Sequence, residues 1–497
     1  MAKEAAAQTQ AAAATTTGEA GLLDQIIQAT RPKTDQQIET AKRSLQEFVA
    51  KLLEPGAVVS KDVEKTINYW IAEIDKKISD QLNEIMHHPE FQKLEASWRG
   101  LFYLVDKSET GTQLKIRVLN ASKKDLLKDL EKASEFDQSG LFKKVYEAEY
   151  GIFGGEPYGV LIGDYEFSHH PEDMALLERI AQVAAAAHAP FISAASPELF
   201  GLESFTEIDA KRDLAKIFDS VEYAKWRSFR ESEDSRYVGL CLPHVLMRLP
   251  YGSNTRRTEG FCFEEDVDGR DHHKYLWGNA AYALGARITD AFAKSGWLAA
   301  IRGVQGGGLV EGLPTHTFRT DEGDIALKCP TEVAITDRRE KEFSDLGFIP
   351  LVHCKGRDFA AFFGTQSCQK PKVYNRDEAN ANARLSAQLQ YILCVSRFSH
   401  YLKAMARDRI GSFTSRAECE RWLNDWINTY VHPSPENAGQ ASLAEKPLAE
   451  ARIDVREVKG KPGHYEAVAY LKPHYQLEAL SVSMRLVAEL PPPQQPK

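Results

Sequence analysis

The sequence predicts an α/β fold that is preceded by a helical arm and followed by a C-terminal α+β region ending in strands. Three observations support this prediction. Apolar residues repeat with helical spacing over residues 35–105, and strand-like and helix-like segments alternate over residues 113–325. After residue 450 the chain closes with three segments in which apolar and polar residues alternate, the pattern of half-buried strands.

The first 58 residues are expected to form an N-terminal arm. Residues 1–20 are rich in Ala, Gln and Thr, a composition typical of low-complexity segments that bury no core. Residues 22–28 could form two turns of helix that end before Pro32, because their aliphatic side chains would share one face. These aliphatic residues are Leu22, Leu23, Ile26 and Ile27.

Three longer helices are expected before the first strand. The first covers residues 35–52, where apolar residues repeat with helical spacing. The second begins near Ser60 and keeps an apolar stripe as far as residue 85. The third follows Pro89, a residue that is favoured in the first turn of a helix.

Residues 59–325 are interpreted as a central α/β domain. Strands are expected at residues 114–122, 158–167, 190–196 and 236–243. Helices are expected at residues 123–133, 171–189 and 278–297. This alternation implies a largely parallel sheet, and the Gly-rich residues 303–314 are expected to form a loop.

Residues 326–497 are interpreted as a second domain. Strands are expected at residues 330–337, 347–353 and 359–365 around a short helix at 338–347. One long helix at residues 376–410 and a shorter one at 415–431 should follow. The closing strands, at residues 451–458, 465–473 and 480–490, have no helix after them to cover an edge.

The composition excludes several classes of protein. Asp and Glu exceed Lys and Arg by 71 to 62, and a net charge of −9 argues against nucleic-acid binding. None of the seven cysteines forms a C-x-x-C pair, which indicates reduced thiols in a cytoplasmic protein. The N-terminus lacks the features of a signal peptide, and no apolar run of about 18 residues predicts membrane insertion.

Motifs for catalysis are weak, so we expect no enzyme activity, no cofactor and no metal. The glycine-rich segments at residues 151–159 and 303–308 match neither a dinucleotide loop nor a Walker loop. One alternative stays open, a metal-dependent α/β hydrolase. Its site would combine Glu264 and Glu265 with His272 and His273, residue types that bind divalent metals.

Five long segments carry a resemblance to a known family. They cover residues 87–105, 146–201, 274–314, 345–367 and 381–413. They resemble the large subunit of the contractile sheath of the type VI secretion system, a family also called TssC or VipB. The resemblance extends over about residues 20–490, so it includes nearly the whole chain.

The resemblance implies a contractile-sheath fold and a structural role. Such a subunit pairs with a small sheath subunit, and many copies of the pair form a helical sheath around an inner tube on a baseplate. Contraction propels the tube and its spike, and an AAA+ recycling ATPase then dismantles the contracted sheath. ATP is used by that partner, which agrees with the lack of a nucleotide loop in this chain.

The resemblance also implies roles for particular residues. The N-terminal helix is the expected handle for the recycling ATPase, and the alternative is packing on the small subunit. Its residues are Leu22, Leu23, Gln25, Ile26 and Ile27. In the family, C-terminal strands pair with strands of adjacent protomers, so we expect such pairing within residues 450–490. The candidates are Ile453, Val455, Val468, Tyr470, Val482, Met484 and Leu486.

The helix at residues 415–431 is the expected contact with the inner tube. Its apolar side chains would face inward and its charged ones outward. The outward residues are Arg416, Glu418, Glu420 and Asp425. Three alternatives to these interface assignments remain open. The charged side of this helix could simply be a solvated face. The C-terminal strands could form an ordinary hairpin within one protomer, and the whole chain could be an ATPase adaptor that forms no polymer.

Overall fold

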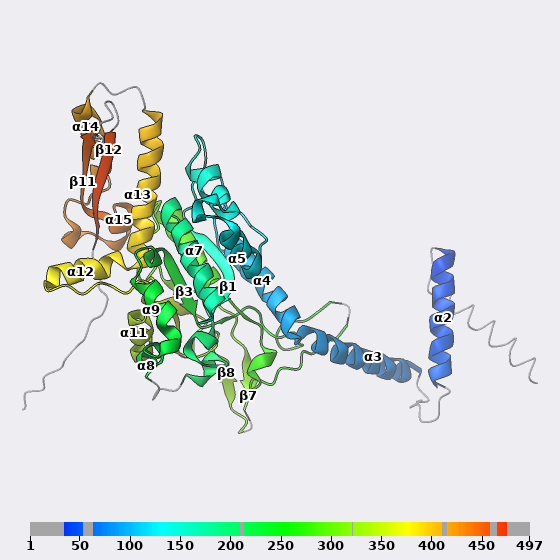
Figure 1. Ribbon diagram of the computed structural model, residues 1–497. Coiled ribbons are helices and arrows are strands. Elements are labelled where there is room, and N and C mark those ends of the chain that lie inside the picture. The colour runs from blue at the N-terminus through cyan, green and yellow to red at the C-terminus, as the bar shows by residue number, and fades with distance from the viewer. Residues whose placement is uncertain are drawn as a thin grey trace, which may run out of the picture. The chain divides into compact units, whose positions relative to one another are not determined.

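The computed structural model describes residues 34–52, 63–208, 213–259, 261–320, 322–409, 415–457 and 465–474. The chain divides into two units, one made of residues 1–82 and 258–263 and the other of residues 83–257 and 264–497. Figure 1 labels many of the helices and strands of both units. Within the described residues, no helix is both long enough and apolar enough to cross a membrane.

The first unit contains α2 (Asp35–Leu52) and most of α3 (Val63–Met86), which confirms the two helices expected there. The predicted start of α3 at Ser60 lies outside the described residues. Isoleucines at positions 67, 71, 74 and 78 of α3 are 42–51% exposed. Their alternating spacing of four and three residues is the period of a coiled-coil seam.

The second unit is built on a six-stranded sheet in the order β1-β2-β3-β9-β10-β6. The strands are β1 (Leu161–Phe167), β2 (Phe191–Ala195), β3 (Val238–Leu242), β9 (Ile349–His353), β10 (Ala360–Phe362) and β6 (Leu309–Val310). The first four run parallel, while β10 is antiparallel to both of its neighbours. This confirms a largely parallel sheet and all of these strands except β6, which lies within the segment expected to be a loop.

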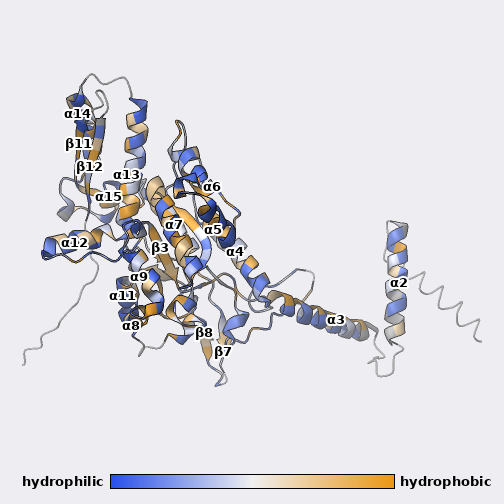
Figure 2. Ribbon diagram, viewed as in Figure 1, coloured by the Kyte–Doolittle hydropathy of each residue, from blue (hydrophilic) through white to orange (hydrophobic). Residues whose placement is uncertain are grey.

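Helices cover both faces of this sheet. Neighbouring residues of a strand point to opposite faces, so each central strand contributes to two cores. On β3, Leu240 joins a core with α7 (Pro171–Ala187), whereas Cys241 joins a second core with α10 (Ala281–Ser295). Apolar residues are concentrated on α7 and β3 (Figure 2). The helix expected at residues 171–189 is confirmed, with Pro171 in its first turn and a left-handed residue, His188, at its C-terminal cap.

Three expectations about the sheet were wrong. Residues 114–122 form no strand, and residues 330–337 contribute only a single bridge, between Thr331 and Val245. In the second segment Ile335 is buried in the core, whereas Val118 and Leu119 of the first segment are 69 and 51% exposed. The sheet also takes β9 and β10 from beyond residue 325, where we expected a second domain to begin. They extend the central sheet beyond β3, which would otherwise be an edge strand.

The long helix expected at residues 376–410 is two helices, α12 (Asp377–Ser386) and α13 (Leu389–Asp408). Gln388 has an extended backbone between them and forms an antiparallel bridge with Gln366. The amide of Leu389 donates to the carbonyl of Thr365 at 2.8 Å. Backbone pairing with the segment after β10 therefore interrupts a helical pattern that is continuous in the sequence.

The C-terminal part of the second unit contains α13, α14 (Arg416–Asn428), β11 (Leu448–Glu457) and β12 (Tyr465–Pro473). The two strands pair antiparallel and pack on α13 and α14 around Phe398 and Ile427. This confirms the predicted helix at 415–431 and the first two closing strands. The third expected strand, at residues 480–490, lies outside the described residues.

Further elements of the second unit complete the layers around the sheet. They are α4 (Pro89–Asp106), α5 (Lys123–Lys132), α6 (Gly140–Phe142), the π-helix η2 (Lys143–Tyr150), α8 (Leu214–Phe218), α9 (Ala224–Glu231), α11 (Asp337–Asp345), α15 (Gln440–Glu445), β4 (Val245–Leu246), β5 (Trp277–Gly278), β7 (Thr317–Arg319) and β8 (Ile325–Leu327). Of these, the helices α4, α5 and α11 were expected from the sequence.

Candidate functional site

The helix α4 packs one face on α10. Ala96, Gly100 and Leu104 are buried along that face, and Leu104 shares a core with Tyr282 and Ala286 of α10. The absence of a side chain at Gly100 lets the Tyr282 ring approach the backbone of α4. The contact orients the helix, so it also decides which residues α4 leaves on the opposite side.

The opposite face of α4 exposes a row of large apolar side chains. We call this row the α4 stripe: Phe91, Leu94, Trp98, Phe102 and Val105, with exposures of 38, 56, 66, 70 and 44%. Their spacing of three or four residues places them along one side of the helix. A contiguous apolar surface of this kind is typical of a protein interface, whereas isolated exposed apolar residues are ordinary.

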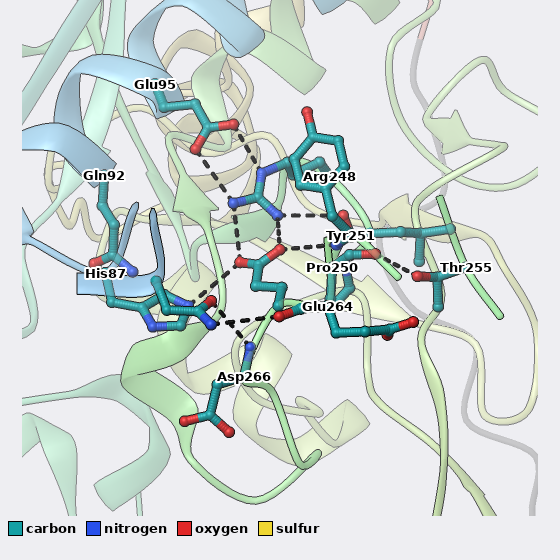
Figure 3. A network of polar contacts seen from close by, with 12 residues as sticks. His87, Gln92, Glu95, Arg248, Pro250, Tyr251, Thr255, Glu264 and Asp266 are labelled. Carbon is teal, nitrogen blue, oxygen red and sulfur yellow. Dashed lines mark hydrogen bonds and ion pairs between the residues drawn. The ribbon is translucent and has the colours of Figure 1, made fainter. Parts of the chain in front are cut away.

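A buried ionic network centred on Arg248 holds α4 in place (Figure 3). The guanidinium donates to Glu95 of α4 through Nε at 2.7 Å and to Glu265 through Nη1 and Nη2 at 2.6 and 3.0 Å. The side chains of Arg248 and Glu265 are only 5 and 1% exposed. Burial disfavours the Glu95 carboxylate, but hydrogen bonds from Arg248 and Arg99 outweigh it and lower its pKa.

The same network fixes the loop that follows β4. The amide of Tyr251 donates to Glu265 at 2.8 Å, and the Tyr251 hydroxyl accepts from Arg99 at 3.0 Å. His87, just before α4, lies with Nε2 at 3.3 Å from the Glu265 carboxylate. Because each carboxylate has several donors, the network is satisfied internally and acts as a structural connection between loop and helix.

A second polar cluster lies at the carboxyl ends of β1 and β3. His244 contacts Glu332 at 2.5 Å through Nδ1 and Glu166 at 3.1 Å through Nε2. Glu332 also accepts from Ser204 at 2.7 Å and contacts His272 at 3.2 Å. Burial disfavours the His244 imidazolium, but the two carboxylates outweigh it and raise the pKa of His244 to about 10.

These two networks divide the residues of the alternative hydrolase site. Glu265 is held by Arg248, while His272 is held by Glu332. Glu264 accepts from the amide of Ser253 at 3.0 Å. In the part of the chain that the structure describes, no three His, Cys, Asp or Glu residues are arranged to hold a metal ion. The four residues therefore do not form the common site that this alternative needs.

Most of the interface residues expected at the two ends of the chain lie outside the described residues. At the N-terminus these are Leu22, Leu23, Gln25, Ile26 and Ile27, and at the C-terminus Val482, Met484 and Leu486. Their roles stay predictions. The structure does describe the four expected strand residues of β11 and β12 and the four charged residues of α14.

The four residues on β11 and β12 divide by burial. Ile453 and Val455 of β11 are 0 and 3% exposed and belong to the core with α13 and α14. On β12, Val468 is half-buried and lies opposite Asp454, while Tyr470 is 48% exposed. The first two residues therefore anchor the hairpin to its own protomer, and the β12 residues are the more accessible pair.

Side chains of α14 occupy the outer edge of β11. Asn424 accepts from the amide of Ile453 at 3.0 Å and donates to its carbonyl at 2.7 Å. Glu420 accepts from the amide of Val455 at 3.1 Å. Within the described residues β12 pairs only with β11. The outer edge of β12 is consequently the one left for another strand.

The charged residues of α14 do not all face outward as expected. Arg416, Glu418 and Asp425 are exposed, but Glu420 is part-buried and binds the backbone of β11. The structure therefore places Glu420 inside the protomer, because an unpaired strand amide needs an acceptor. Leu423 and Ile427 are buried, as the helical pattern predicted.

Neither the α4 stripe nor the His244 cluster is predicted from the sequence. A signal for the stripe was present, since α4 has apolar residues on two faces, and a helix of this kind is buried on both. No sequence signal marks His244 and Glu332, which lie 88 residues apart. The fold brings their side chains together because their backbones pair: the Glu332 amide donates to the His244 carbonyl at 2.8 Å.

Comparisons with known proteins agree with this architecture. Residues 68–369 match the model of the EvpB/VC_A0108 tail sheath N-terminal domain, and residues 378–490 match the EvpB/VC_A0108 tail sheath gpW/gp25-like domain. The type VI secretion system sheath protein TssC1 of Pseudomonas aeruginosa is 53% identical over 471 residues, which are 94% of each chain.

Two solved structures of the anti-feeding prophage are more distant. Its baseplate has a TM-score of 0.33 at 7% identity, covering 63% of this chain and 66% of that one. Its contracted helical sheath has a TM-score of 0.30 at 9% identity, and the match covers 64% of this chain and 67% of that one. We draw nothing from likenesses this low. The two family models and the sheath protein suffice: the chain belongs to the TssC/VipB family of contractile-sheath large subunits of the type VI secretion system.

Proposed function

We propose that this chain builds the contractile sheath of a type VI secretion system by burying its α4 stripe against the small sheath subunit. Sheath subunits of this family co-assemble with a small subunit and with further copies of themselves. The observation that carries the proposal is the stripe itself, whose Trp98 and Phe102 are 66 and 70% exposed. A free protomer would hold these two large side chains in water.

The energetics agree with an assembly role. Fully burying one large apolar side chain yields roughly 1.5–3 kcal/mol, so covering the five side chains of the stripe, which are 38–70% exposed, could yield about 4–8 kcal/mol. Association costs on the order of 4–15 kcal/mol, which leaves only a part of that gain as affinity. The stripe is presented on a helix that Tyr282 and Arg248 hold on its other side, so little ordering is needed on binding.

Electron microscopy after co-expression with the small subunit tests this proposal. We expect tubules from the wild-type chain and none from a Trp98→Asp, Phe102→Asp variant that remains folded by circular dichroism. Particles of one size from the wild-type pair would favour a non-polymerising adaptor. Tubules from the variant would remove the stripe from the interface with the small subunit.

Neighbouring protomers are further joined through strands at residues 450–490. The supporting feature is the outer edge of β12, which has no partner strand within the described residues. A strand of a neighbour could pair there, and each shared hydrogen bond would contribute on the order of 1 kcal/mol. Val468 and Tyr470 would flank such a strand, with Val482, Met484 and Leu486 as the candidates that reach another protomer. Ile453 and Val455 would anchor the hairpin.

The inner tube contacts the exposed face of α14. Glu418 and Asp425 lie seven residues apart on that helix, so they share a side, and Arg416 is exposed near its start. Reversing the charges of Glu418 and Asp425 should impair sheath assembly on the tube more than pairing with the small subunit. The opposite order of effects would argue against this placement.

The N-terminal arm is the handle for an AAA+ recycling ATPase. Four aliphatic side chains, Leu22, Leu23, Ile26 and Ile27, would yield about 6–12 kcal/mol before ordering and association costs. A single helix should therefore bind weakly, and many aligned copies on a contracted sheath would bind more tightly. In this scheme the sheath supplies mechanical movement on its baseplate, and ATP is hydrolysed by the partner.

A further inference from the structure

A cysteine and a histidine meet at the rim of the sheet, far along the chain from one another. Cys329 follows β8, and His353 is the last residue of β9. Their side chains are hydrogen-bonded to each other, and both are part-exposed. The Cys329 sulfur also lies 3.2 Å from the Thr331 hydroxyl. These contacts belong to neither of the two ionic networks described above.

The orientation of the imidazole is fixed by a third group. Nε2 of His353 lies 2.7 Å from the carbonyl oxygen of Arg357. A carbonyl oxygen can only accept, so Nε2 carries a proton and Nδ1 is left for the sulfur. A nucleophile beside a base that a further group orients is the arrangement that activates a thiol.

The surroundings make the ion pair more populated than it would be for an isolated cysteine and histidine. Burial disfavours both charges, but the mutual hydrogen bond, the mutual attraction and the hydrogen bonds to Thr331 and Arg357 together outweigh it, so the pKa of Cys329 is lowered and that of His353 is raised. The amide of Thr331 adds a hydrogen bond to the sulfur. By contrast, burial raises the pKa of Cys368 and of Cys394 to about 12.

We propose that Cys329 is a modification site that takes up small anionic disulfides by thiol–disulfide exchange, with His353 as its base. The Cys329 thiolate attacks one sulfur of the disulfide, the old S–S bond breaks, and a mixed disulfide forms. The departing thiolate takes the proton from the His353 imidazolium, so the disulfide is the oxidant and no other reagent is needed.

An anionic disulfide is favoured by the charges around the pair. Lys328 precedes Cys329, and Lys355 and Arg357 are exposed in the turn that follows His353. This turn is closed by a hydrogen bond from the Arg357 amide to the Cys354 carbonyl at 3.1 Å. Asp358 in the same turn, and Asp268 and Asp271 close to Lys328, offset part of this positive charge. The three cations should therefore give a modest preference for a disulfide that carries carboxylates.

Glutathione disulfide is the probe for this site. The full-length chain is incubated with it, free thiols are then blocked, and the modified peptides are counted by mass spectrometry. Cys262 and Cys354, both exposed, are internal controls. We expect Cys329 to be modified at least about tenfold faster than either at pH 7, because more of it is thiolate. Modification of Cys329 no faster than that of the two controls would overturn the proposal.

Variants separate the roles of the base and of the charges. His353→Gln should slow modification of Cys329 about tenfold, whereas Cys262→Ser should leave it unchanged. An unchanged rate in folded His353→Gln would refute the role of His353. If that variant does not fold, the wild-type pH profile decides, since Cys329 must react at lower pH than Cys354.

The preference for anions is tested with a second probe, neutral hydroxyethyl disulfide. Equal rates of Cys329 modification by this probe and by glutathione disulfide would refute the preference.

Discussion

Gly100 of α4 lies directly against the ring of Tyr282 on α10. A Cβ at Gly100 would stand 2.3 Å from Cδ2 and 2.4 Å from Cε2 of that ring. Tyr282 is 8% exposed, and its hydroxyl is hydrogen-bonded to Asp164, so the ring has no room to turn away. This contact sets the distance between the helices and thereby the position of the α4 stripe.

Replacing Gly100 by Ala should therefore destabilise the fold. The added methyl group overlaps the Tyr282 ring, and overpacking of a core costs roughly 1–3 kcal/mol. The higher helix propensity of Ala returns up to about 1 kcal/mol, so the net loss is smaller than the strain. Urea denaturation measures it. Gly439→Ala is the matched control, because a Cβ there meets nothing within 4 Å, and an equal loss in both variants would contradict the explanation.

Charges on the α4 stripe should abolish co-assembly without unfolding the chain. Trp98→Asp and Phe102→Asp change side chains that are mostly in water in the protomer, so the melting temperature should stay within a few degrees. Pull-down by the small subunit should fall at least tenfold. Val221→Asp is the control, since Val221 is 87% exposed but lies outside the stripe. Equal binding by all three variants would exclude the stripe as the interface.

The His244 cluster should make stability depend on pH. The pKa of His244 is raised to about 10, so its contribution is complete below its ordinary pKa of about 6.5 and disappears as the pH rises toward 10. The pKa of Glu332 is held well below its usual range, so its contribution is complete above about 4.5 and is lost in acid. The combined contribution of His244 and Glu332 to the free energy of unfolding is therefore greatest between about pH 5 and 6.5.

His244→Gln tests this dependence. At pH 6 the variant should lose roughly 1–3 kcal/mol, because Glu332 and Glu166 lose a charged donor. The difference from wild type should shrink as the pH rises to 10. Urea denaturation at a series of pH values gives both results, and a difference that does not change with pH would show that His244 is neutral in the fold.

Leu23→Asp with Ile26→Asp should abolish binding to the N-terminal domain of the recycling ATPase. Charged side chains cannot enter an apolar groove without a large desolvation cost. Sheath assembly should be unaffected, which electron microscopy checks alongside a binding titration. Thr16→Asp with Thr17→Asp adds the same charge to the arm and should bind normally. Loss of assembly instead of ATPase binding would mean that the arm packs on the small subunit.

Removing residues 475–497 should separate folding from polymerisation. The hairpin of β11 and β12 ends at Pro473 and packs within its own protomer, so thermal stability should be retained. Filaments should not form, because the strand that contains Val482, Met484 and Leu486 is proposed to join neighbours. Normal filaments from this shortened chain, seen by electron microscopy, would refute the exchange of these strands.

Local patterns in the sequence determined most of the elements. Pro171 and the apolar run after it specify α7, the apolar residues 190–196 specify β2, and the alternation from Ile453 to Val455 specifies β11. These signals act between residues a few positions apart, so they can be read without the fold. The long segments shared with the sheath family likewise determined the family from the sequence alone.

Contacts between distant residues were decided only by the tertiary structure. The helix after residue 376 breaks at Gln388 because Gln366 offers a backbone partner 22 residues earlier. Glu420 faces β11 because its carboxylate accepts from the Val455 amide. Its position in the helical pattern alone would allow the side chain to point to solvent equally well. Trp98 is exposed because Gly100, two residues on, fits against Tyr282 and fixes which side of α4 is covered. A one-dimensional pattern shows that a helix has two apolar faces, but only packing determines which face remains for a partner.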